Sequence, residues 1–77
     1  GHSEGRSKKV YIVVESVGNR FSVKGVFNSS EKAKAQIRRT IGDALRYAPE
    51  AEVEDLPTGK RIHSRGLSVT YQEWTVT

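Results

Sequence analysis

The 77-residue chain has the length of one small domain and carries a formal net charge of +4. Domains this short lie near the lower limit for folding without disulfides or bound metals. The sequence has no cysteine to form a disulfide or hold zinc. Its longest apolar run, residues 10–14, is far shorter than the roughly 20 residues that cross a bilayer. The totals therefore predict a soluble domain with a small core, which burial against a second copy or another partner would stabilise.

The first eight residues are polar, charged and glycine-containing, and we expect them to form a disordered tail. The opening Gly-His-Ser resembles a cloning scar, so His2 is left out of the functional reasoning. No apolar segment of the kind that a signal peptide needs is visible at this end. We therefore expect a single domain over residues 9–77, located in the cytoplasm.

The positive charge is concentrated in the first half of the chain. Residues 1–40 hold nine Lys and Arg against three Asp and Glu, a balance of +6. Residues 41–77 hold four against six, a balance of −2. Such a distribution favours electrostatic steering toward an anionic partner, either a nucleic acid or an acidic protein surface. The charges alone do not distinguish these two partner classes.

Two strands are predicted at the start of the domain. Residues 9–17, KVYIVVESV, are rich in β-branched and aromatic residues, and residues 21–27, FSVKGVF, follow a turn at 18–20. Gly25 interrupts the second strand and indicates a bulge or a close packing contact. The first strand is apolar on both faces, which is typical of a central strand: one face carries Val10, Ile12 and Val14, and the other carries Tyr11, Val13 and Val17.

A helix is predicted to follow this hairpin. Asn28 can cap its first turn, and Glu31 can reach back to complete a capping box. The helix should end near Tyr47, because Pro49 disfavours a helical conformation at the preceding residue. Its apolar residues recur at helical spacing and form one stripe, made of Ala33, Ile37, Ile41, Ala44, Leu45 and Ala48.

Residues 48–66 show no regular pattern. A structureless loop of this length is unusual in a compact domain, so the segment is either functional or contains a short strand within residues 50–64. Residues 67–77, LSVTYQEWTVT, then predict a last strand. Leu67, Val69 and Tyr71 alternate, whereas Trp74 continues with the opposite parity, which indicates a bulge near residues 72–73.

The assembled order is β-β-α-β, and the fold class is α+β. We expect a three-stranded antiparallel sheet with the first strand in the centre and one helix packed on one face. A single helix covers only one face of such a sheet. The opposite face, which we expect to carry Tyr11 and Val13, must then be covered by the long loop, a second copy or a partner.

Three segments carry a resemblance to known proteins: VYIVVE at 10–15, GVFNSSEKAKAQI at 25–37 and YQEWTV at 71–76. They resemble short, mostly uncharacterised proteins of tailed bacteriophages and bacteria. The shared motifs are a strand, a helix cap and a tryptophan anchor, and none contains a catalytic residue. The resemblance implies the fold and a phage or bacterial origin, with the cytoplasm of the host cell as location. It also favours a protein that binds a host protein.

The residue types argue against catalysis and against a metal site. His63 is the one histidine that remains, and no serine stands in a recognisable arrangement with a base. The acidic residues of 50–55 lack the order and spacing of a calcium loop. We therefore expect a protein that is not an enzyme and that needs neither a cofactor nor a metal.

Binding is the remaining function class, and six residues are its candidates. The lead hypothesis is a small non-enzymatic protein, encoded by a phage, that binds a bacterial host protein and inhibits or redirects it. The alternative is a basic DNA- or RNA-binding protein, and a third reading is a dimeric accessory domain. Trp74 is expected to be a core anchor, and Tyr11 is the better candidate for an exposed aromatic. The candidate contacts are Tyr11, Arg38, Arg39, Lys60, Arg61 and Arg65.

Overall fold

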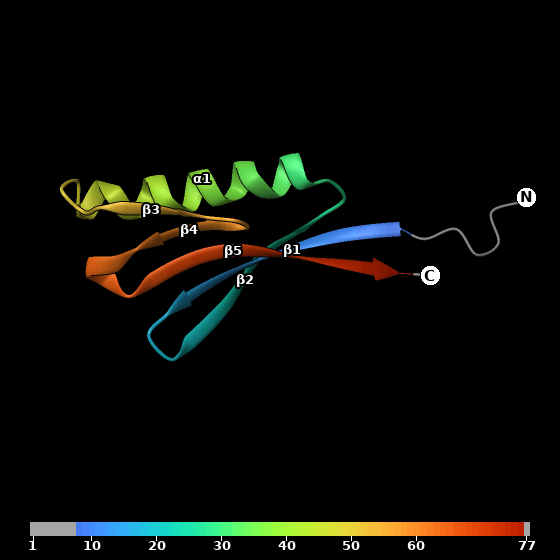
Figure 1. The fold of residues 1–77 in the computed structure, drawn as a ribbon, viewed down its shortest axis with the longest axis horizontal. Helices are drawn as coiled ribbons and strands as arrows, with labels where there is room; N and C mark the ends of the chain where they lie inside the picture. The colour runs from blue at the N-terminus through green and yellow to red at the C-terminus, as the bar shows by residue number, and fades with distance from the viewer. Residues whose placement is uncertain (1–7, 77) are drawn as a thin grey trace, which may run out of the picture.

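The structure, a computed structural model, describes residues 8–76 and has one helix lying along one face of a five-stranded sheet (Figure 1). The tail predicted for residues 1–8 lies outside the described residues except for Lys8, which begins the first strand. The elements in chain order are β1 (Lys8–Val17), β2 (Arg20–Phe27), α1 (Ser30–Tyr47), β3 (Val53–Leu56), β4 (Gly59–Ile62), the 3₁₀ turn η1 (His63–Arg65) and β5 (Leu67–Val76).

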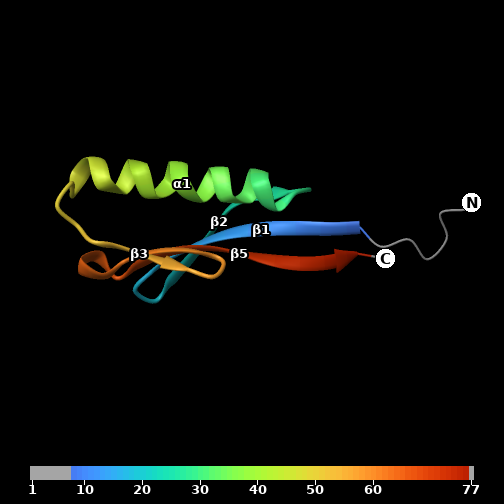
Figure 2. The ribbon, with the colours of Figure 1, turned by 45° about the horizontal axis from the view of Figure 1, so that its top comes forward.

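All neighbouring strands are antiparallel, in the order β2-β1-β5-β4-β3. The α+β class and the pairing of β1 between its hairpin partner and the last strand are therefore confirmed. The expected number of three strands was too low, because β3 and β4 extend the sheet beyond β5. The chain passes from one edge, β2, through α1 to the opposite edge, β3, so the helix crosses the whole sheet on one side (Figure 2).

The first hairpin forms as predicted, with its turn at Gly18 and Asn19. Gly18 has φ 58°, a left-handed conformation that glycine adopts without steric cost. The bulge predicted in the second strand is present as well. Val13 pairs with Gly25 and Val14 with Val23, so the intervening residue of β2 has no partner across the ladder.

The helix begins one residue later than the sequence indicated. Ser29, rather than Asn28, has the extended backbone of a cap residue, and its hydroxyl accepts a hydrogen bond from the backbone N–H of Lys32 at 3.3 Å. The third helical position is therefore Lys32, so Glu31 does not complete a capping box. The predicted end at Tyr47 is confirmed.

The core lies between α1 and the middle of the sheet. The predicted apolar stripe of α1 faces it, and Thr40, which the stripe did not include, is buried beside it and accepts a hydrogen bond from the Gln36 amide at 3.0 Å. Only seven apolar residues among those described are fully buried, which is a small core for a domain. They are Val13, Ala33, Ile37, Ile41, Ile62, Leu67 and Val69.

Residues 53–62 form a short hairpin rather than an irregular loop. The two residues Pro57 and Thr58 join β3 to β4, and β4 pairs with β5 over four residues. This confirms that the segment contains a strand of its own and shows that it contains two. The hairpin is held to the core by Ile62, whose side chain is completely buried.

The last strand is regular against β1, and the bulge predicted near residues 72–73 is absent. Ten successive pairs join β1 and β5 without a shift, from Lys8 with Val76 to Val17 with Leu67. The change of parity at Trp74 therefore has another cause: the apolar side chains move from one face of the sheet to the other. Beyond β2 and β4, the two strands continue as a ribbon that projects past the start of α1 (Figures 1 and 2).

The one α-helix within residues 8–76 is not apolar enough to cross a membrane.

Candidate functional site

The face of the sheet opposite α1 is uncovered in the described part of the chain and carries a row of apolar side chains. Residues paired across antiparallel strands share a face, and Val13 faces the helix, so the even-numbered residues of β1 face away from it. We call this side of β2, β1 and β5 the open face. Its most exposed apolar residues, with their exposed fractions, are Phe21 (74%), Val23 (64%), Val26 (60%), Trp74 (54%) and Val76 (52%).

This assignment reverses the expected orientation of the first strand. Tyr11 and Val13, which we placed on the uncovered side, point toward α1, and Val13 is completely buried. The uncovered side instead presents Val10, Ile12 and Val14 of β1. The prediction of Trp74 as a core anchor was also wrong, because its side chain lies on the open face and is half exposed.

Tyr11 belongs to a small polar and aromatic cluster at the margin of the core. Its hydroxyl donates a hydrogen bond to Glu73 Oε2 at 3.0 Å, and its ring meets that of Tyr71 edge-to-face at 5.7 Å. Lys9 lies 3.6 Å from the same carboxylate. Tyr11 is therefore half-buried and engaged within the chain, which leaves it less available to a partner than we expected.

The hydrogen bond to Glu73 raises the pKa of Tyr11 above 10.0, and partial burial together with the nearby negative charge acts in the same direction. The bond therefore adds stability below pH about 10, and this stability is lost as the pH rises through the raised pKa. Replacing Glu73 by glutamine should lower the pKa of Tyr11, measured from the ring-carbon NMR shift during a pH titration. An unchanged midpoint in the Glu73→Gln variant would show that the carboxylate does not control this titration.

A groove runs between α1 and the β3–β4 hairpin, and we call it the α1–hairpin groove. Its walls carry three cationic side chains: Lys34 and Arg38 stand one turn apart on α1, and Lys60 comes from β4. Its apolar lining includes Ile37, Leu56 and Pro57. The groove thus combines positive walls with an apolar floor.

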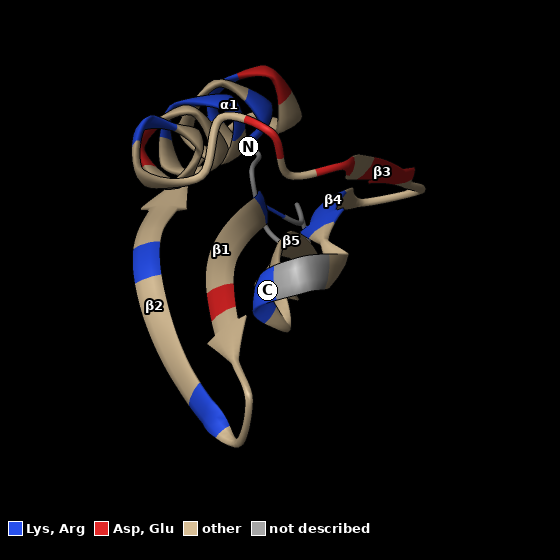
Figure 3. Ribbon diagram, turned by 90° about the vertical axis from the view of Figure 1, so that its left-hand side faces the viewer, with Lys and Arg blue, Asp and Glu red and all other residues tan. Residues whose placement is uncertain are grey.

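The charges around the groove are partly balanced. Lys60 forms an ion pair with Asp55 across the hairpin, whereas no described carboxylate lies within 4.0 Å of the Lys34 or Arg38 cation. The two helix residues are exposed, so their charges are available to a ligand. Figure 3 shows blue on α1 and on β4, with the acidic strand β3 along the outer edge.

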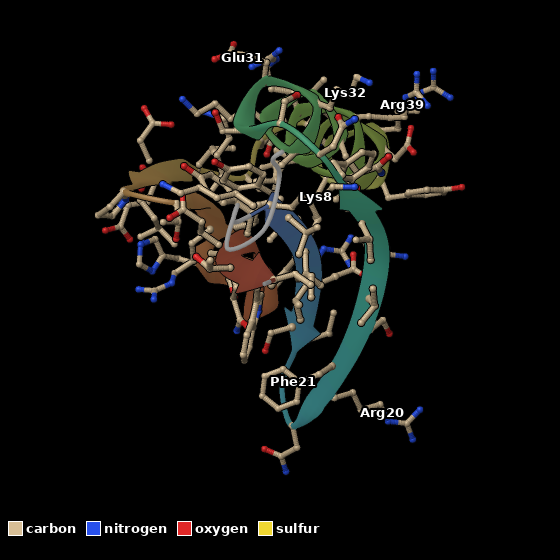
Figure 4. The ribbon with its side chains drawn as sticks, turned by 90° about the vertical axis from the view of Figure 1, so that its right-hand side faces the viewer. Lys8, Arg20, Phe21, Glu31, Lys32 and Arg39 are labelled. Atoms are coloured by element: carbon tan, nitrogen blue, oxygen red, sulfur yellow. The ribbon has the colours of Figure 1, made fainter. Side chains whose placement is uncertain are left out.

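The structure brings only two of the six predicted contact residues together, Arg38 and Lys60. Arg39 lies on the other flank of α1, toward β2, beside Lys32 (Figure 4). Arg61 points to the open side of the sheet and pairs with Glu54 at 3.7 Å. Arg65 lies at the far end of the helix, where its guanidinium donates to the Tyr47 carbonyl at 3.5 Å. Lys60, Arg61 and Arg65, which are close in the sequence, therefore lie in three different places.

Sequence reasoning missed Lys34 as a groove residue, although the spacing contained a signal. Lys34 and Arg38 are four residues apart and so lie on the same side of a helix. The spacing alone does not show that β3 and β4 stand opposite them.

His63 Nε2 makes a hydrogen-bond contact with Glu54 Oε1 at 2.5 Å, on the open side of the hairpin. Both side chains are exposed, and Glu54 is shared with Arg61, which makes the arrangement a polar network at the surface. Within residues 8–76, no three His, Asp or Glu side chains are grouped as metal ligands. The groove and the open face are two arrangements in the described residues that could bind a partner.

Comparison with family models matches residues 8–60 to the "Domain of unknown function (DUF7336)". The match covers more than two thirds of the chain. The chain belongs to the DUF7336 family. No curated protein and no solved structure matches it significantly.

The DUF7336 match extends from the start of β1 into β4. The matched residues therefore include every groove residue except Tyr71. They also include the apolar residues of the open face that lie on β1 and β2. Trp74 and Val76, which complete the open face, lie beyond the matched residues.

Proposed function

We propose that this DUF7336 protein is a non-enzymatic binding module that holds an acidic segment of another protein in the α1–hairpin groove. The observation that carries the proposal is the convergence of Lys34, Arg38 and Lys60, from two different elements, around an apolar floor. Cations of this kind attract and orient an acidic partner, while apolar contacts with the floor hold it.

A protein fits this groove better than a nucleic acid does. The hairpin wall carries Asp55, which lines the groove and would stand close to any phosphate backbone that tracked the helix cations. Among described residues, the remaining unpaired cations of α1, such as Arg39, lie on another flank and do not extend the groove into a continuous basic stripe. A short acidic peptide or loop needs no such stripe.

The resemblance to small phage and bacterial proteins supports a bacterial partner. On this basis we propose that the protein is encoded by a phage, acts in the host cytoplasm, and inhibits or redirects the host protein that it binds. Small proteins without a catalytic site can act in this way by covering a surface that the host protein needs.

Charge reversal in the groove tests the proposal. We expect Lys34→Glu/Arg38→Glu to weaken binding of the captured partner at least tenfold by calorimetry, because two exposed cations become like charges to an acidic ligand. Capture from a bacterial lysate identifies the partner. The matched control is Lys32→Glu/Arg39→Glu, which makes the same charge change on the other flank of α1.

The control variant should bind as the wild type does. Equal losses in the two variants would mean that general charge, not the groove, governs binding. Mobility shifts with random DNA and RNA at low and moderate salt test the alternative function, and we expect no shift. A salt-sensitive shift that the groove variant abolishes would show that the groove binds a nucleic acid and not a protein.

A further inference from the structure

The open face exposes an apolar surface that is large for a small domain. Its five most exposed apolar side chains include a phenylalanine and a tryptophan, and together they present roughly 500 Å² of apolar area. A patch of that size lies near the upper end of what monomeric proteins expose. A stable interface buries about 800 Å² on each partner, which this patch approaches once the adjoining side chains of β1 and β5 are included.

The apolar patch carries no charged residue among those described, apart from Lys8 at its end. Phe21, Val23 and Val26 line β2, and the neighbouring side chains of β1 on the same face are Val10, Ile12 and Val14. The charges of β2 point to the other side, where Lys24 pairs with Glu15 at 3.3 Å. In Figure 4, Phe21 and Arg20 point to opposite sides of β2.

The charged residues on the open side lie at the opposite edge of the sheet. Glu54 of β3 and Arg61 of β4 form an ion pair there, beyond the polar row of β5, and His63 contacts the same glutamate. Two copies can therefore stack their apolar halves without placing like charges together. An acidic or basic partner, in contrast, would find no complementary charge in the patch.

From the size of the patch and its neutrality, we infer that the open face is the interface of a homodimer. A second copy supplies an equal, uncharged apolar surface, and an isologous pair lets each patch cover the other. The small core supports the same inference, because only seven apolar residues are buried among those that the structure describes. This inference does not depend on the proposed function, which uses the groove on the helix side.

In the dimer, the two sheets stack face to face at about 10 Å, as in β-sandwiches. Trp74, whose indole N–H donates to Gln72 Oε1 at 3.2 Å, then moves from a half-exposed position into the interface. Because it is the one tryptophan of the chain, its fluorescence reports on this interface alone.

Sedimentation equilibrium between 1 and about 100 μM tests the inference. We expect the wild type to sediment as a dimer, and Phe21→Asp/Val26→Asp to weaken the dimer at least 100-fold, because each charge would be buried without a partner. Both residues are largely exposed in one chain, so the substitutions should leave the monomer folded by circular dichroism. The matched control, Ser22→Asp, adds a charge to the same strand on the helix side and should remain dimeric.

Tryptophan emission provides a second measurement on the same samples. It should shift to shorter wavelength as the wild-type concentration rises and should not shift in the double variant. A wild type that is monomeric at 100 μM would overturn the inference and leave the patch to another occupant. A double variant that stays dimeric would overturn it too, since the interface would then lie elsewhere.

Discussion

Replacing Gly59 by alanine should remove about 3 kcal/mol or more of the free energy of unfolding. A Cβ atom at Gly59 would lie 2.0 Å from the Val69 carbonyl oxygen and 2.7 Å from the Thr70 Cα. Both are backbone atoms of β5, so the clash is relieved only if β4 moves away from its partner strand. Small domains typically have a total stability of roughly 5 kcal/mol, so a loss of this size would remove most of it.

Gly42→Ala is the control for this substitution. A Cβ at Gly42 meets no atom within 4 Å, and the residue lies inside α1. The same chemical change should therefore stabilise the domain by up to about 1 kcal/mol through helix propensity. Urea denaturation of both variants checks the opposite signs. If Gly59→Ala were as stable as the wild type, the close approach of β4 to β5 would be contradicted.

Truncation of Ile62 to alanine should cost about 2–5 kcal/mol, because the side chain is completely buried and a cavity would remain. Ile62 is the residue through which the β3–β4 hairpin reaches the core. We therefore expect the melting temperature to fall by roughly 10–20 °C in a domain of this size. The proper comparison is at one protein concentration, because dimerisation adds stability that depends on concentration.

Val53→Ala is the matched control, since Val53 pairs with Ile62 across the hairpin but remains 38% exposed. It should cost less than about 1 kcal/mol. Similar melting temperatures for the two variants would mean that the hairpin is not anchored in the core, and the α1–hairpin groove would then lose its fixed wall.

The helix and the first hairpin could be predicted from the sequence because their signals are local. The spacing of Ala33, Ile37 and Ile41 defines the buried side of α1, and Pro49 limits its end. The cap was displaced by one residue because Asn28 and Ser29 are both good cap residues, and local sequence does not distinguish them.

The orientation of the sheet could not be read from β1 because that strand is apolar on both faces. The last strand contained the missing information: Leu67, Val69 and Tyr71 alternate with Ser68, Thr70 and Gln72. The apolar set marks the helix side, and the register with β1 then places Val13 on that side. The later change of parity at Trp74 marks the open face rather than a bulge.

The candidate site was harder to predict because it depends on contacts between distant segments. The cations of residues 60–65 look like one cluster in the sequence, yet the hairpin and η1 direct Lys60, Arg61 and Arg65 to three different places. The charge pairs with Glu54 and Asp55 follow from cross-strand register. That register could not be predicted, because residues 48–66 show no regular pattern in the sequence.

The groove and the open face lie on opposite sides of the sheet, so one dimer would carry two grooves. Each copy contributes a complete groove from its own α1 and hairpin, and dimerisation through the open face covers neither. A partner with two acidic segments would then bind more tightly, because binding of the first segment raises the effective concentration of the second at the other groove.

The mass of the complex formed with the captured partner, measured by sedimentation equilibrium, tests the central claim that the two surfaces act separately. We predict two copies of this chain with two copies of a partner that has one acidic segment. The Phe21→Asp/Val26→Asp variant should give a complex with one copy of each. A wild-type complex with one copy of each would contradict the account, because the partner would then occupy the open face in place of the second copy.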